Sequence, residues 1–303
     1  MYLYHFGLTE LPFTLTPNTS FYCGLKMHDE ALQVLLAALK TGEGFIKVTG
    51  EVGTGKTLLC RKLLNDIPDH FITAYIPNPY LPPAELRHAI ADELGVPAHD
   101  EQDQHRLVRA IEKRLVELNQ QGRSVVLIID EAQALPTESL EALRLLSNLE
   151  TEKRKLLQLV MFGQPELDER IATRELRQLR QRISFSYQLR PLTGPELGRY
   201  VNHRVQIAGY KGSALFTSEI IWWIHQASRG VPRLANVLCH KMLLLAYGSG
   251  RHHLTVADAR RAIQDTEDAQ LPKRRELWWF LIGMIAATVL AIVLIYALEL
   301  FPA

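Results

Sequence analysis

The octapeptide Gly-Glu-Val-Gly-Thr-Gly-Lys-Thr at residues 50–57 follows directly on the apolar run 45–49 and limits the possible folds more than any other segment. Its glycines allow a tight concave turn in which successive backbone N–H groups point at phosphate oxygens. Lys56 adds a cation for the β- and γ-phosphates, and the Thr57 hydroxyl is a ligand for Mg²⁺. A helix at 58–65 would point its positive end at the same anions. The alternative is a glycine turn with a stray lysine, which the flanking strand and helix disfavour. The sequence therefore predicts a site for nucleotide phosphate.

The remaining apolar runs predict an α/β domain followed by helices. The predicted strands are residues 45–49, 71–76, 124–129, 156–162 and 184–189, and the helices among them include residues 29–40, 84–94, 105–121 and 137–151. Strands that alternate with helices favour right-handed crossovers and a doubly wound parallel sheet. After a break at 190–195, the predicted helices are residues 196–208, 218–228, 232–247 and 255–267. This second part is predicted to be a small helical domain.

Two carboxylates end the most apolar of the predicted strands. Asp130 and Glu131 follow the continuous run 124–129, which is typical of a strand buried on both faces of a parallel sheet. The carboxyl end of that strand is expected beside the phosphate loop. Asp130 can then hold Mg²⁺ through its water shell, and Glu131 can polarise a water that attacks the γ-phosphate. A simple Asp-Glu helix cap is the alternative, and the phosphate loop upstream favours the catalytic interpretation.

Gln164 and Arg233 are further candidates for contact with the nucleotide. Gln164 follows the predicted strand 156–162, where its amide can orient the attacking water or touch the γ-phosphate. It is otherwise a turn residue of a Gly-Gln-Pro corner. Arg233 begins a predicted helix of the helical domain, where a cation can bind phosphate and couple hydrolysis to domain rotation. A surface charge is the other interpretation.

A basic stretch precedes the last predicted strand. It contains Arg170, Arg174, Arg177, Arg180 and Arg182. A solvated face is the default for such a run, and contact with nucleic acid is another possibility. An arginine that reaches the γ-phosphate of a neighbouring subunit would lower the barrier to hydrolysis strongly. Arg182 is the first choice for this role and Arg180 the second.

The C-terminal region carries a long uncharged stretch. Residues 277–298 contain no charged side chain, and about 20 apolar residues suffice to cross a hydrocarbon core of about 30 Å. Aromatic residues lie near both ends, and the basic residues 273–275 precede the stretch. A buried core helix is the alternative. The pattern predicts one transmembrane helix, with the bulk of the protein on the cytoplasmic side.

Charge and cysteine content narrow the class of protein. A formal net charge of +1 argues against a nucleic-acid binder that works by bulk electrostatics. The three cysteines are scattered without metal-binding spacing, which indicates reduced thiols in a cytoplasmic compartment.

In combination these segments resemble the AAA+ ATPases of the ExeA/GspA type. The similar segments are residues 1–8 with 12–13, then 50–57, 127–133, 163–167, 179–183 and 230–233, and the similarity runs from residue 1 to about residue 268. Within the group, residues 38–60 and their flanks are most similar to the MshM type, the ATPases of mannose-sensitive haemagglutinin (type IV) pilus biogenesis. Members of the family carry a periplasmic peptidoglycan-binding domain after a membrane span. The sequence here ends at Ala303, so cell-wall binding is not carried over.

The resemblance implies an α/β P-loop AAA+ core of sheet order 5-1-4-3-2, a helical lid and an ATP-driven homo-oligomeric ring. It assigns Lys56 and Thr57 to Walker A, Asp130 and Glu131 to Walker B, Gln164 to sensor 1 and Arg233 to sensor 2. The predicted nucleotide-binding residues are Gly50, Glu51, Val52, Gly53, Thr54, Gly55, Lys56, Thr57, Leu58 and Arg233. The predicted catalytic residues are Glu131, Lys56, Gln164, Arg182 and Arg180, and the predicted Mg²⁺ ligands are Thr57 and Asp130.

These expectations combine into one prediction of function. The chain is predicted to be an ATP hydrolase of the bacterial inner membrane, with an ATPase core at 1–190, a lid at 191–270, and a basic stretch and anchor at 271–303. It would use ATP and Mg²⁺ to assemble or position a pilus or secretion complex through an inner-membrane partner. The alternative is a DNA-associated AAA+ ATPase of the transposition-helper or loader type, against which near-neutral charge counts.

Overall fold

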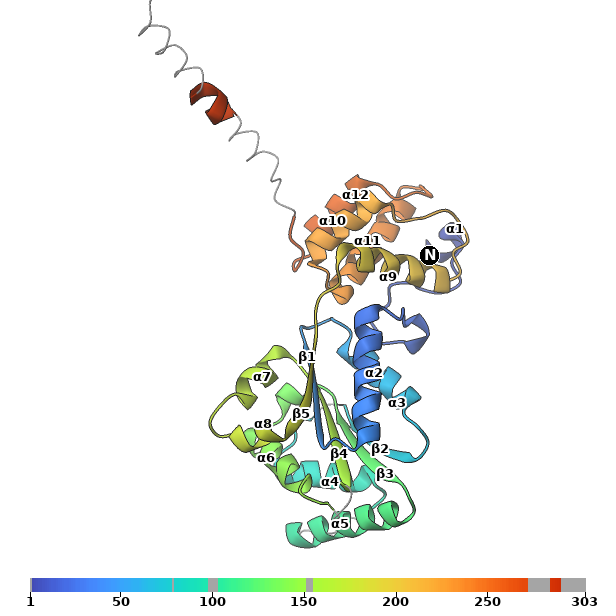
Figure 1. The fold of residues 1–303 in the computed structure, drawn as a ribbon. Helices are drawn as coiled ribbons and strands as arrows, with labels where there is room; N and C mark the ends of the chain where they lie inside the picture. The colour runs from blue at the N-terminus through green and yellow to red at the C-terminus, as the bar shows by residue number, and fades with distance from the viewer. Residues whose placement is uncertain (1, 78, 98–102, 151–154, 272–283, 290–303) are drawn as a thin grey trace, which may run out of the picture.

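The structure is a computed structural model that describes residues 2–77, 79–97, 103–150, 155–271 and 284–289. Its centre is a parallel sheet of five strands (Figure 1). The strands are β1 (Phe45–Gly50), β2 (Phe71–Ile76), β3 (Ser124–Ile129), β4 (Leu157–Gly163) and β5 (Ile183–Leu189). They lie in the order β2-β3-β4-β1-β5, which confirms the predicted order.

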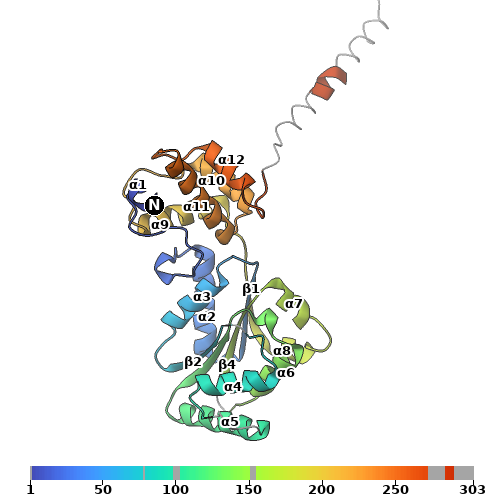
Figure 2. The ribbon, with the colours of Figure 1, turned by 180° about the vertical axis from the view of Figure 1, so that it is seen from behind.

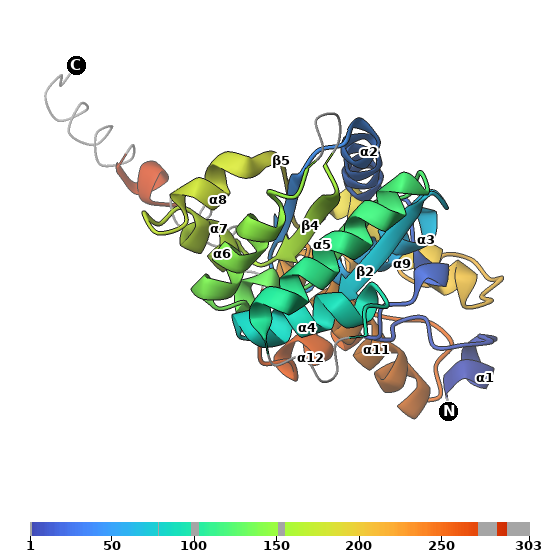
Figure 3. The same ribbon diagram turned by 90° about the horizontal axis from the view of Figure 1, so that it is seen from below.

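Helices cover both faces of the sheet, and the alternation of side chains along β3 shows how. Val126 and Ile128 join one apolar cluster with α2 (Lys26–Thr41) and α3 (Lys56–Asp66). Val125, Leu127 and Ile129 belong to a second cluster on the opposite face. That face is covered by α4 (Pro83–Glu93), α5 (Gln104–Gln120), α6 (Thr137–Leu146), α7 (Pro165–Ile171) and α8 (Arg177–Arg182). Figure 3 shows α4 and α5 crossing the sheet on this side. Strand β3 is buried on both faces, which explains its unbroken apolar sequence.

Helices α9 to α12, which follow the sheet, form what we call the helical group. They are α9 (Gly194–Ile207), α10 (Ser218–Ser228), α11 (Pro232–Gly248) and α12 (Val256–Gln264). They pack together beyond the end of the sheet that carries the phosphate loop (Figures 1 and 2). The apolar cluster on the α2 side of the sheet continues through Leu189 and Leu192 into these helices. The helical group and the sheet therefore share one continuous core.

The N-terminal residues pack on the helical group rather than on the sheet. Helix α1 (Tyr2–Phe6) lies against α11, where the Tyr2 hydroxyl is 2.9 Å from His240 Nδ1. The N–H of Thr9 donates to the carbonyl oxygen of Ala208 at 2.8 Å. The chain then passes through a short 3₁₀ turn, η1 (Thr19–Phe21), to reach α2. The start of the chain and the helical group are thus brought together beyond the sheet (Figure 1).

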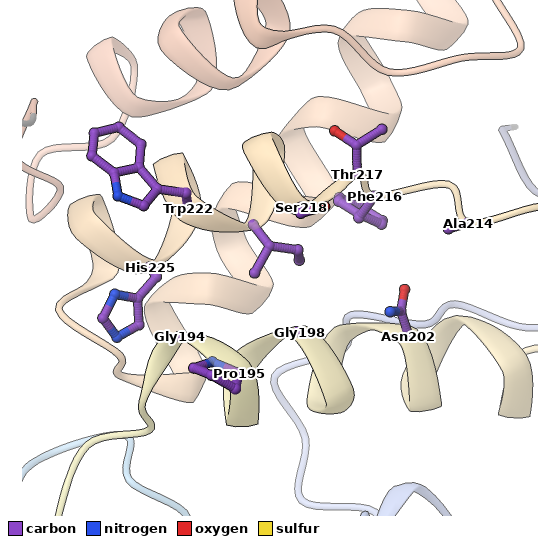
Figure 4. Close-up of a pocket in the computed structure, with 11 residues that line it drawn as sticks. Gly194, Pro195, Gly198, Asn202, Ala214, Phe216, Thr217, Ser218, Trp222 and His225 are labelled. Atoms are coloured by element: carbon purple, nitrogen blue, oxygen red, sulfur yellow. The ribbon is translucent and has the colours of Figure 1, made fainter.

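The helical group also carries a cavity of about 680 Å³ between α9 and α10. Figure 4 shows Trp222 and His225 on α10 and Pro195 on α9 among the lining residues, and Trp222 is half-exposed. None of the residues predicted from the sequence to bind nucleotide lines this cavity. It is therefore separate from the site described below.

The prediction of a membrane anchor needs correction. Most of the predicted span 277–298 lies outside the described residues, and the part described, 284–289, is a helical stretch of about 9 Å at about 1.5 Å per residue. Crossing a hydrocarbon core of about 30 Å takes a continuous helix of about 20 residues. In the described ranges, no helix is both long and apolar enough for that. For this part of the chain, the predicted transmembrane helix and the single-pass inner-membrane location are wrong.

Candidate functional site

The segment between β1 and α3 forms a cradle of backbone groups at the carboxyl edge of the sheet. Gly53 and Gly55 have φ angles of +80° and +102°, a left-handed backbone that glycine adopts without a steric penalty. The Thr54 hydroxyl closes the turn by donating to the carbonyl oxygen of Glu51 at 2.8 Å. His28 packs against this loop, with its Nε2 3.1 Å from the Thr54 carbonyl oxygen. The loop has the conformation that aims N–H groups at an anion.

Lys56 begins α3 and folds its side chain back along this loop. Its ammonium group donates to the carbonyl oxygens of Gly50 at 2.7 Å and Glu51 at 3.0 Å. The side chain is buried, and burial lowers the pKa of Lys56, against the opposing effect of the carboxylates Glu131 and Asp130. Gly50 and Glu51 therefore hold the lysine. Neither residue lines the cavity at the phosphate loop that is described below.

Thr57 and Asp130 meet at the foot of the loop. Asp130 is 2% exposed, follows β3, and accepts a hydrogen bond from the Glu131 N–H at 3.0 Å. The Thr57 side chain lies close enough to lower the pKa of Asp130. Burial raises the pKa of Asp130, and these two groups and Lys56 oppose that rise. Mg²⁺ in nucleotide sites takes one or two protein oxygens and completes its octahedron with water and phosphate. A hydroxyl and a carboxylate side by side fit this ligand set.

Glu131 is held by two amides. Its Oε2 accepts from Gln133 Nε2 at 2.6 Å and from Gln164 Nε2 at 3.1 Å. The two glutamines also contact each other directly, because Gln133 Oε1 accepts from the backbone N–H of Gln164 at 3.0 Å. Burial raises the pKa of Glu131, but these amides and Lys56 outweigh it, so the pKa lies below its usual value. The result is a charged carboxylate in a defined orientation.

The backbone of Glu131 is unusual as well. Its φ angle of 53° is left-handed, one of only two such non-glycine residues in the described ranges. A residue other than glycine in this region is strained and is held there by its surroundings. The 3₁₀ turn η2 (Ala132–Ala134) follows at once and carries Gln133 back toward the carboxylate. Sequence analysis missed Gln133 as an individual residue, although a polar amide two positions after a catalytic candidate is a signal it could have used.

Arg233 brings the helical group to the loop. It lies in the first turn of α11, and its backbone N–H donates to the carbonyl oxygen of Gly53 at 3.2 Å. A Cβ built on Gly53 would lie only 2.6 Å from the Cβ of Arg233. The side chain of Arg233 lines the same cavity as Lys56. Only a glycine permits so close an approach of helix and loop.

One cavity of about 170 Å³ joins these groups. The predicted site residues that line it are Val52, Gly53, Gly55, Lys56, Thr57, Leu58, Glu131, Gln164 and Arg233. Its remaining wall comes from residues that sequence analysis did not select, namely Thr14, Leu15, Thr16, Pro17, Asn18, Tyr200, Arg204, Pro232 and Asn236. The cavity therefore runs from the phosphate loop to the junction of the N-terminal segment with the helical group.

Arg182 and Arg180 lie elsewhere. Both are on α8, on the opposite face of the sheet from α3, and neither lines the cavity. Arg182 Nη1 donates to Ser147 Oγ at 3.3 Å, and Arg180 is exposed. Their predicted role in trans concerns a neighbouring subunit's nucleotide, so it stays a prediction.

The chain is similar in sequence to known proteins, over its AAA-type region and beyond it. A family profile described as "AAA domain" matches residues 39–171. The General secretion pathway protein A of Aeromonas hydrophila is 41% identical over 258 residues, which are 85% of this chain and 47% of that protein. The chain thus spans about half the length of this curated relative.

Solved structures with the same fold are more distant in sequence. The Aeropyrum pernix ORC2 protein, solved as ADPNP–ADP complexes, is 18% identical with a TM-score of 0.59, over 82% of this chain and 69% of that one. Drosophila ORC bound to DNA is 19% identical with a TM-score of 0.61, over 84% and 64%. The RuvB Holliday junction branch migration motor of Thermotoga maritima is 15% identical with a TM-score of 0.53, over 84% and 73%. At such identities the likeness concerns the fold alone. The chain carries an AAA domain, a P-loop ATPase module, at residues 39–171.

Proposed function

We propose that this protein binds ATP with Mg²⁺ in the cavity at the phosphate loop, hydrolyses it, and uses the helical group as a lid. The observation that carries the proposal is the convergence of Lys56, Glu131, Gln164 and Arg233 on one cavity, from four separate elements. Phosphoryl transfer needs mainly positioned charges and a positioned water, and these residues supply both.

Each residue has a defined part in this proposal. Lys56 binds the β- and γ-phosphates, and Thr57 and Asp130 hold the metal ion. When bound, Mg²⁺ neutralises charge on the phosphates as they react. Glu131, oriented by its amide partners, accepts a hydrogen bond from the attacking water. Gln164 also contacts the γ-phosphate as sensor 1.

Arg233 completes the set on the lid side. Its helix is hydrogen-bonded to the phosphate loop, so a change at the phosphates alters the contact between loop and helical group. We propose that this couples hydrolysis to movement of α9–α12. In a homo-oligomeric ring, Arg182 or Arg180 of one subunit would reach the nucleotide of the next.

The work performed is proposed from the relative. The Aeromonas protein is named for the general secretion pathway, and 41% identity over 85% of this chain supports a partner in a secretion complex. A pilus-assembly complex of the mannose-sensitive haemagglutinin type is the narrower form of this proposal. DNA-stimulated turnover would instead support the DNA-associated alternative.

Turnover assays test the enzyme proposal. Lys56→Ala is expected to abolish ATP hydrolysis, whereas Lys62→Ala, on the same helix but paired with Asp66 at the surface, should leave it unchanged. Glu131→Gln is expected to bind ATP and retain it. Unchanged phosphate release by Lys56→Ala would overturn the proposal. The Glu131→Gln protein, loaded with ATP, then serves to capture partners, with Lys56→Ala as the matched non-binding bait.

A further inference from the structure

Asn236 presents a buried acceptor in the wall of the cavity. It lies on α11, one helical turn beyond Arg233, and therefore on the same face of the helix. The residue is 5% exposed and lines the cavity. Its Oδ1 is buried and has no hydrogen-bond partner. Buried polar atoms in folded proteins are almost always paired, so an unpaired one in a cavity wall points to a ligand that supplies the donor.

The neighbours of Asn236 leave the oxygen as the available end of its amide. Asn236 lies beside Tyr200 and opposes the rise that burial causes in the pKa of that phenol. Arg204 Nη1 donates to the same hydroxyl at 3.0 Å. Neither neighbour donates to Asn236 Oδ1, which is left to accept from a ligand.

Arg204 makes this wall rigid. It is buried, donates from Nε to the carbonyl oxygen of Pro12, and lies over the ring of Phe21 at 4.7 Å. These contacts tie α9 to the N-terminal segment, whose residues 14–18 also line the cavity. An acceptor held in place by its neighbours discriminates better than one on a mobile side chain.

We propose that Asn236 Oδ1 accepts a hydrogen bond from the 6-amino group of adenine and so selects ATP over GTP. This inference rests on the nucleotide site of the proposed function. Guanine carries an oxygen at the same ring position, and two acceptors facing each other repel. A site built to bond a substrate donor rejects analogues that lack it, because the buried acceptor is then left unpaired. The two other buried unpaired side-chain atoms in the described ranges, on Glu141 and His203, do not line this cavity.

The experiment measures dissociation constants for ATP, GTP, purine riboside triphosphate and 2′-deoxyATP. We expect the wild-type protein to bind ATP about tenfold or more tightly than GTP and the purine analogue, which lacks the 6-amino group. In Asn236→Leu, which keeps the volume but removes the acceptor, that preference should disappear. Asn202→Leu, on α9 and outside this cavity, is the matched control and should keep it.

Three results would overturn the assignment. The first is equal binding of ATP and the purine analogue by the wild-type protein, a measurement that needs no folded variant. The second is an unchanged ATP-to-GTP ratio in a folded Asn236→Leu protein. In the third, Asn236→Leu weakens the binding of ATP but not that of 2′-deoxyATP, which would mean that the acceptor bonds the ribose. Failure of the wild-type protein to bind any nucleotide would instead refute the proposed function.

Discussion

The backbone N–H of Arg233 donates to the carbonyl oxygen of Gly53 at 3.2 Å, so helix α11 begins directly on the phosphate loop. The contact is backbone to backbone and does not depend on the arginine side chain. Any displacement of α11 from the loop must break it or carry the loop along. In the proposed function, residue 53 is therefore the point at which a change at the phosphates would reach the helical group.

Substitution of Gly53 by alanine should therefore uncouple the two. The new Cβ would clash with Cβ of Arg233, which lies 2.6 Å from its position, and φ of +80° adds about 1–2 kcal/mol of backbone strain. We expect a loss of nucleotide affinity of tenfold or more. Gly122→Ala is a matched control, since its φ is +75° and its Cβ would meet no atom within 4 Å. Titration calorimetry measures the nucleotide affinity of both variants, and thermal unfolding measures the effect of the backbone strain on their stability. Equal nucleotide affinities would contradict the coupling.

Gln133 should prove to be a positioning residue for Glu131. Gln133→Leu removes one of the two amide donors to Oε2, and we expect turnover to fall by roughly ten- to a hundredfold with nucleotide affinity unchanged. The donated bond also lowers the pKa of Glu131, so its loss should raise that pKa and move the acidic limb of the pH–rate profile to higher pH.

Steady-state kinetics across the acidic range check this prediction. Exposed Gln206→Leu on α9 serves as the control and should reproduce the wild-type profile. A purely structural role for Gln133 would lower activity at every pH without moving the limb.

His28 should make the fold sensitive to mild acid. Burial lowers the pKa of His28 below its usual 6.5, while its Nε2 lies 3.1 Å from the Thr54 carbonyl oxygen. Below pH of about 6.5 the unfolded chain takes up a proton that the folded protein does not, so stability falls as pH decreases toward the folded pKa. Urea unfolding between pH 7.5 and about 5 measures the slope. His28→Gln, which does not titrate there, should flatten it, whereas exposed His253→Gln should not; an unaltered slope in His28→Gln would refute the prediction.

An arginine that acts on the nucleotide of a neighbouring subunit can be identified by mixing subunits of two inactive variants. If Arg182 is that residue, Arg182→Ala subunits and Glu131→Gln subunits should each be inactive alone but regain partial activity when mixed, because one mixed interface carries both intact groups. The same test applies to Arg180→Ala. Exposed Arg174→Ala, from the same basic stretch, is the control and should remain active alone. Absence of recovery for both arginines would leave the trans role without support.

Local patterns in the chain were enough to predict the sheet and the first half of the site. The glycine spacing of 50–57 and the apolar run that ends at Asp130 are contiguous signals, and the structure brings both to one edge of the sheet. The strand order followed from the resemblance and is confirmed. The uncharged stretch 277–298 misled, because composition alone does not establish a continuous spanning helix, and none is present in the described ranges. Helices α7 and α8 escaped prediction because they have only a few residues each.

The sequence alone thus predicts phosphate binding, because the groups involved belong to short contiguous segments whose residue types and spacing are characteristic of it. The residues that surround these groups are known only from the folded structure. Residues 14–18, Tyr200 and Asn236 meet the loop although they are far from it along the chain. No periodicity or motif marks such residues, since their contact arises from packing of the N-terminal segment and the helical group on one continuous core.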